Sequence, residues 1–95
     1  MLLNVPLKKN EVVSLKLVSG EEIIGRLVEE LNEAVTLTKV LSISLTAQGV
    51  GMMPFMFSAE IEKEIKINAN HIISKIQPTK HISDQYIHNT TDIRI

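Results

Sequence analysis

The most constraining feature of this chain is a pair of short apolar runs within residues 12–37 that flank a glycine-marked turn. In the first run, 13–17, apolar side chains recur at every second position. Because successive side chains of a strand point to opposite faces, this period predicts a half-buried strand. Gly20 follows at a turn, and Gly25 lies inside the next run, 23–30. A glycine inside a strand usually marks a bulge or a sharp bend, so the pattern predicts strands that curve.

Further strand-like runs continue as far as residue 76. Apolar residues alternate with Ser and Thr at 34–48, a run longer than most strands, in which Val40 breaks the alternation at a bend or on a covered outer face. Pro54, in the apolar run 52–57, has no backbone N–H and requires a strand edge or a bulge. The other predicted features are a Gly-rich turn at 48–51, a strand at 64–68, a tight turn at 68–70 and a last strand at 71–76. Together these elements predict an all-β fold, a small five-stranded and strongly bent barrel.

The length of 95 residues predicts a single domain. Its predicted boundaries are 1–95 for the whole domain, about 12–77 for the barrel and 78–95 for a C-terminal extension. Pro78 ends the last strand, because it cannot continue a sheet ladder. Ile82 and Tyr86 are four residues apart, the spacing of a short helix in the extension. Ser83 or Asp84 would supply its N-cap.

Composition narrows the class of protein further. The formal net charge of −1 and the isoelectric point near 6.3 argue against a domain that binds phosphates mainly through its overall charge. There is no cysteine, which excludes disulfides and thiolate metal sites. The first seven residues lack the basic leader of a secretory signal, and the uncharged stretch 40–59 is too rich in Ser, Thr, Gly and Pro to predict a membrane span. We therefore expect a cytoplasmic protein.

Two segments of the chain resemble the signature motifs of the Sm-like family. In the first, Leu17, Gly20, Gly25 and Leu27 match the family's leucine, its two glycines and the apolar position that follows. In the second, residues 67–72 (INANHI) match its Ile-Arg-Gly, two variable residues and an apolar residue. The run MMPFMF and the C-terminal extension are most similar to a divergent, phage-associated branch, which implies the host cytoplasm. The resemblance implies an SH3-like barrel that assembles into a homo-oligomeric ring of five to eight subunits and binds RNA.

The resemblance also implies where RNA would bind. Family members that bind uridine-rich RNA surround the base with a loop Asp, a loop Asn and the Arg of the second motif, and here these positions hold Asn32, Thr36 and Asn68. The missing Arg matters because its planar guanidinium can stack on a base and donate several hydrogen bonds. The stacking position is Ala34, and the Gly after the Arg is Ala69. The candidate nucleic-acid-binding residues are therefore Asn32, Thr36, Asn68, Asn70 and His71.

Other polar residues give weaker signals. Lys39 and Lys66 could supply local positive charge for phosphates, although a lone strand lysine more often solvates an outer face. The alternating acidic residues at 60–64 indicate a solvated turn, and the three histidines have no metal-ligand spacing. No catalytic motif is recognisable, so we expect neither an enzyme nor a cofactor.

Two functions remain open at this level. The first is a ring that binds single-stranded RNA or DNA through pore-facing loops, with a role in RNA or DNA processing. The second is a structural or protein-interaction ring that has lost RNA binding, which the near-neutral charge, the missing Arg and the Met/Phe run at 52–57 favour. In either case we expect that run to lie in the barrel or at a subunit interface, since edge-strand pairing covers exposed edges.

Overall fold

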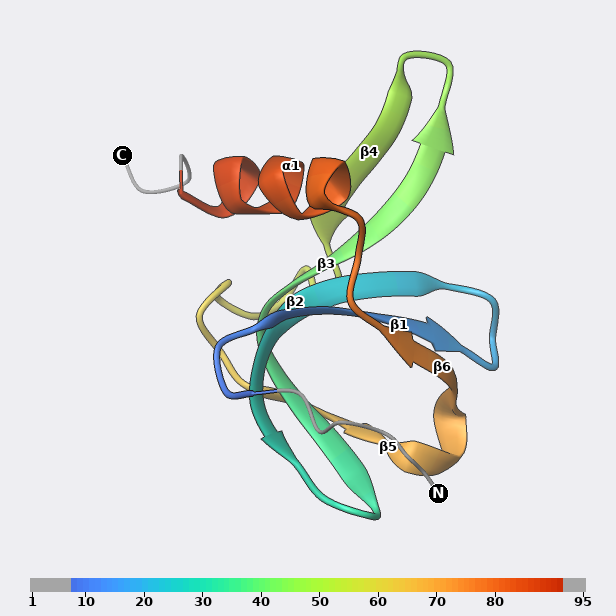
Figure 1. Ribbon diagram of the computed structural model, residues 1–95, viewed down its shortest axis with the longest axis vertical. Coiled ribbons are helices and arrows are strands. Elements are labelled where there is room, and N and C mark those ends of the chain that lie inside the picture. The colour runs from blue at the N-terminus through green and yellow to red at the C-terminus, as the bar shows by residue number, and fades with distance from the viewer. Residues whose placement is uncertain (1–7, 92–95) are drawn as a thin grey trace.

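The protein folds into a strongly bent antiparallel sheet with one C-terminal helix. The computed structural model describes residues 8–91 (Figure 1). Its strands are β1 (Val12–Leu17), β2 (Glu22–Glu30), β3 (Ala34–Thr46), β4 (Gly49–Pro54), β5 (Ile65–Asn68) and β6 (Ile72–Ile76). A short 3-10 turn, η1 (Ala69–His71), joins β5 to β6, and the helix α1 spans Lys80–Thr91. The strand order is β4-β3-β2-β1-β6, and β5 also pairs with β3.

The sheet has six strands where the sequence predicts five. Both β4 and β5 pair with the long strand β3, β4 with its C-terminal half and β5 with its N-terminal half. Pairing with β3 stops at Pro54 and resumes at Ile65. The residues that pair with β3 therefore form two separate strands, β4 and β5. Pro54 ends β4, which is the terminal strand of the sheet, as the missing N–H requires.

The sheet bends where β2 pairs with β3. The β2–β3 register shifts between Ile24 and Arg26, so Gly25 lies at a bulge, as predicted. On β3 the bend falls at Lys39, whose φ of 54° is unusual for a residue with a side chain. The bend resets the alternation of β3, so Leu37 and Val40 both belong to one buried cluster. On an unbroken strand, residues three apart would point to opposite faces, so of the two explanations offered for Val40 the bend is confirmed.

Replacing Gly25 with alanine is expected to destabilise the protein. A Cβ at this position would lie 3.1 Å from the carbonyl oxygen of Thr38 and 3.2 Å from Cβ of Leu37. Neither neighbour can move freely, so we expect Gly25→Ala to lower the free energy of unfolding by about 1–3 kcal/mol, measured by urea denaturation. Gly51→Ala is the control, because its nearest neighbour is the methyl group of the exposed Thr46 side chain. Equal urea midpoints for the two variants would contradict the prediction.

Two apolar clusters hold the fold together. The larger cluster lies inside the curve of the sheet, and its buried members are Val13, Leu15, Leu17, Ile23, Leu27, Val35, Leu37, Val40 and Ile67. The smaller one joins α1 to the sheet, and its buried members are Ile24, Leu41 and Tyr86. The larger cluster confirms the predicted period of two in β1. The smaller cluster explains why β2 and β3 also carry apolar residues on the face of the sheet that α1 covers.

The C-terminal extension is helical, as the spacing of Ile82 and Tyr86 suggests, but its start differs from the prediction. The helix begins at Lys80, and the hydroxyl of Thr79 accepts a hydrogen bond from the backbone N–H of Ile82 (3.3 Å). Ser83 and Asp84 therefore lie within the helix and do not cap it. Thr79 is the one residue between Pro78 and the helix, and its hydroxyl makes it the cap.

The buried Tyr86 is expected to make stability depend on pH in the alkaline range. Burial raises the pKa of Tyr86 well above its usual value near 10, although the nearby Arg26 opposes this shift. Above pH 10 the unfolded chain loses the Tyr86 proton and the folded chain keeps it, so stability should fall as pH rises above 10. Tyr86 is the only tyrosine of the chain, so phenolate absorbance reports on it alone. The Tyr86→Phe variant should lack this contribution, and a normal titration of the folded protein near pH 10 would contradict the prediction.

The β3–β4 hairpin projects from the rest of the sheet, and α1 packs beside it (Figure 1). Its turn is shorter than predicted, because Gly49 and Gly51 belong to β4. Gly49 adopts a φ of 115°, which a residue with a side chain rarely adopts, directly after the turn at residues 47–48. The side-chain amide of Gln85 on α1 donates a hydrogen bond to the carbonyl oxygen of Val50 (2.8 Å). Within residues 8–91, no helix is both long and apolar enough to cross a membrane.

Candidate functional site

Two loops that are far apart in the sequence meet at the end of the molecule away from α1 (Figure 1). One loop joins β2 to β3 through residues 31–33, and the other is η1 between β5 and β6. The backbone N–H of Ala69 donates a hydrogen bond to the carbonyl oxygen of Glu33 (2.9 Å), and the N–H of Leu31 closes its own loop on the carbonyl of Ala34 (2.8 Å). The two loops are therefore fixed to one another by the backbone.

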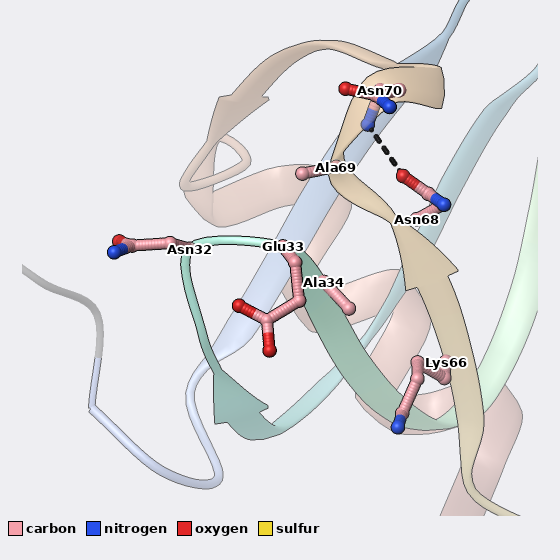
Figure 2. A pocket seen from close by; sticks show the side chains of 7 residues that line it. All are labelled: Asn32, Glu33, Ala34, Lys66, Asn68, Ala69 and Asn70. Carbon is pink, nitrogen blue, oxygen red and sulfur yellow. Dashed lines mark hydrogen bonds between the residues drawn. The ribbon is translucent and has the colours of Figure 1, made fainter.

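A hollow of about 640 Å³ lies between these loops. Figure 2 shows the side chains that line it, which are Asn32, Glu33, Ala34, Lys66, Asn68, Ala69 and Asn70. Ala34 and Asn68 are direct partners in the pairing of β3 with β5, so their side chains share one face of the sheet. Three of the five residues proposed from the sequence, Asn32, Asn68 and Asn70, thus line one hollow.

Asn68 is held in place by its own chain. Its Oδ1 accepts a hydrogen bond from the backbone N–H of Asn70 (2.9 Å), so Asn68 is the N-cap of η1 (Figure 2). This bond is typical of Asn before a tight turn. Since one lone pair of Oδ1 is engaged in the cap, the group of Asn68 that has no partner among the described residues is the Nδ2 amide, which is a hydrogen-bond donor.

The other two asparagines lie on different sides of the hollow. Figure 2 shows Asn32 extending from the β2–β3 loop and Asn70 from η1. Both residues are exposed to solvent. Each amide provides both donors and an acceptor, so the rim of the hollow can exchange hydrogen bonds with a polar ligand of either kind.

Thr36 does not line the hollow. It lies in β3 with a neighbour in pairing register on each side, Glu29 in β2 and Lys66 in β5, and only 9% of its surface is exposed. It occupies the same face as Ala34, two residues further along the strand. The structure therefore leaves Thr36 next to the hollow but largely covered.

His71 lies at an adjoining hollow of about 460 Å³, whose lining is mostly apolar. Its lining residues are Leu17, Val18, Ser19, Phe55, Lys66, Ile67, Asn68 and His71. Lys66 and Asn68 line both hollows. His71 is exposed, and its backbone carbonyl accepts a hydrogen bond from the backbone N–H of Val18 (2.8 Å). The structure thus places His71 beside the Asn-lined hollow rather than in it.

The charged residues of the site are Lys66 and Glu33. Lys66 was a candidate from the sequence, whereas Lys39 lies at the bend of β3, where its carbonyl oxygen accepts a hydrogen bond from Tyr86. Glu33 was not a candidate, and the only available signal was its place beside Asn32 in the loop. One positive and one negative side chain leave the hollow without net charge. Within residues 8–91, no three His, Asp or Glu side chains lie close enough together to hold a metal ion.

A scan of the chain against models of known protein families finds no match, and a search of curated proteins finds no similar sequence.

Proposed function

We propose that this chain is an Sm-like protein that forms a homo-oligomeric ring and binds single-stranded RNA or DNA through the loops around the Asn-lined hollow. The observation that carries the proposal is the meeting of the two predicted loops, with Asn32, Asn68 and Asn70 around one hollow. Single-stranded nucleic acids are recognised through unstacked bases whose edges accept and donate hydrogen bonds, which amide side chains can match.

The edges of the sheet support the ring. In the described part of the chain, β6 pairs only with β1, and β5 pairs only with β3. Each strand therefore has an edge whose backbone groups have no strand partner, and an edge of one copy can pair with an edge of the next. A ring of five to eight copies would repeat the hollow and raise the avidity of a weak site.

The charge of the hollow predicts modest affinity. Lys66 is its only cationic side chain among the described residues, and Glu33 opposes it. Since phosphate contacts give most of the salt dependence of nucleic-acid binding, the affinity should fall only shallowly with salt.

A structural or protein-interaction ring is the second candidate function. It is favoured by the apolar run at the end of β4 and after it, where Phe57 is 80% exposed and Met53 and Met56 are also exposed. Exposed methionine and aromatic side chains suit adaptable protein contacts. In this case the hollow would not bind nucleic acid.

The test is light scattering together with fluorescence anisotropy on short single-stranded oligonucleotides. The variant combines Asn32→Ala and Asn70→Ala with Asn68→Asp, because Asp keeps the oxygen that caps η1 and removes the Nδ2 donor. We expect the ring mass to remain and the affinity to fall by at least about tenfold. Gln48→Glu, at the exposed tip of the β3–β4 hairpin, is the control for the added charge.

Each other outcome has a definite meaning. A ring that binds no oligonucleotide at low salt would favour the structural ring. Unchanged affinity in the triple variant would exclude the hollow as the binding site. A monomer would contradict both candidate functions.

A further inference from the structure

The Glu33 carboxylate is the one acidic group among the described residues that line the hollow, and no cation is paired with it there. The ion pairs in the described part of the chain join Lys75 to Glu30 and Lys80 to Asp84, and no hydrogen bond within that part involves the Glu33 side chain. Its backbone, in contrast, is fixed by the hydrogen bond from Ala69. Both carboxylate oxygens can therefore accept hydrogen bonds from a ligand, and the backbone that carries them is held in place by the fold.

The neighbouring groups are donors or small apolar side chains. Figure 2 shows Glu33 and Lys66 on the same side of the hollow. Lys66 carries only donors, and Asn68 presents its Nδ2 amide because its Oδ1 caps η1. Ala34 and Ala69 add only methyl groups. Selectivity between bases must then come from the edge of the base, because these two alanines offer no aromatic or guanidinium plane for stacking.

We propose, on the basis of the function proposed above, that the hollow prefers guanine and that Glu33 is the residue that determines this preference. The Watson–Crick edge of guanine carries two adjacent donors, N1–H and the N2 amino group, which match the two oxygens of one carboxylate. The O6 acceptor beside them would face the ammonium group of Lys66, which lies on the Glu33 side of the hollow (Figure 2). Charge-assisted bidentate pairs of this kind are among the strongest hydrogen bonds available to a side chain.

The other bases match this set less well. Uracil offers a single donor, N3–H, between two carbonyl oxygens that a carboxylate would repel. Cytosine and adenine each offer one amino group next to a ring-nitrogen acceptor, which also faces the carboxylate unfavourably. Guanine is thus the only common base that satisfies both carboxylate oxygens with its Watson–Crick edge.

The test compares labelled uridine strands in which every third base is uracil, cytosine, adenine, guanine or inosine, by fluorescence anisotropy on the intact oligomer. Inosine lacks the N2 amino group and is otherwise like guanine. We expect guanine strands to bind roughly tenfold more tightly than the others, inosine included. Glu33→Gln should remove this preference, because an amide has one acceptor oxygen in place of two. Glu22→Gln, at the opposite end of β2, is the matched control.

The outcomes separate the two proposals. Binding that does not depend on the base, or a guanine preference that survives in Glu33→Gln, would overturn the role of Glu33 and leave the nucleic-acid function intact. Absence of binding to every strand, in the unmodified protein and at low salt, would overturn the nucleic-acid function and the guanine preference with it.

Discussion

Replacing Tyr86 with alanine is expected to lower the free energy of unfolding by about 3–5 kcal/mol. Tyr86 is fully buried between α1 and the sheet, where it packs with Ile24 and Leu41. Its hydroxyl donates a 2.6 Å hydrogen bond to the carbonyl oxygen of Lys39, the residue at the bend of β3. The substitution leaves a cavity and removes the partner of that carbonyl, so α1 loses its main attachment.

Urea denaturation followed by circular dichroism measures this effect, with two further variants for comparison. Ile87→Ala is the matched control, because Ile87 is the next residue of the same helix and is exposed. Tyr86→Phe removes only the hydroxyl and should cost about 1 kcal/mol. If Tyr86→Ala unfolded at the same urea concentration as Ile87→Ala, the helix would not be anchored by this residue.

Most strands could be predicted from the sequence because their signal is local. The alternation in β1 and β3, the turn at Gly20 and the bulge at Gly25 each follow from a few adjacent residues. The helix cap was predicted wrongly because Thr79, Ser83 and Asp84 are all good caps, and the structure uses the first of them, Thr79, directly after Pro78. The sequence marks separate runs at 52–57 and 64–68, but it does not show that both pair with β3, on either side of the bend at Lys39, which is a tertiary feature. The predicted count of five strands was wrong for this reason.

The site is predictable only to the level of its loops. The sequence places Asn32 and Asn68 in two loops, but the register of β3 against β5 decides which neighbouring residues join them. That register puts Lys66 opposite Thr36, so Thr36 is covered by its neighbours while Lys66 lines the hollow. No local pattern contains this information, which is why the full lining of the hollow is found only in the structure.

Breaking the ion pair between Lys75 and Glu30 is expected to lower the free energy of unfolding by about 1–3 kcal/mol. Lys75 pairs with the buried Leu15 across β1 and β6, and Glu30 pairs with the buried Val35 across β2 and β3. Cross-strand partners share a face, so both charged side chains point to the inner face of the sheet. Only about a quarter of each side chain is exposed (27% and 25%), and Oε1 of Glu30 has no hydrogen-bond partner in the described part of the chain.

The variant Lys75→Met keeps most of the apolar stem and removes the ammonium group, which leaves the carboxylate of Glu30 partly buried and unpaired. The double variant with Glu30→Leu removes both charges and should regain most of the lost stability, because a buried ion pair can be replaced by apolar side chains at little cost. A double-mutant cycle by urea denaturation isolates the interaction energy of the pair.

Lys80→Met is the matched control. Lys80 and Asp84 form an exposed pair one helical turn apart, so the loss of this pair should change the urea midpoint little. If Lys75→Met were as stable as Lys80→Met, the inner ion pair would contribute nothing to the stability of the sheet.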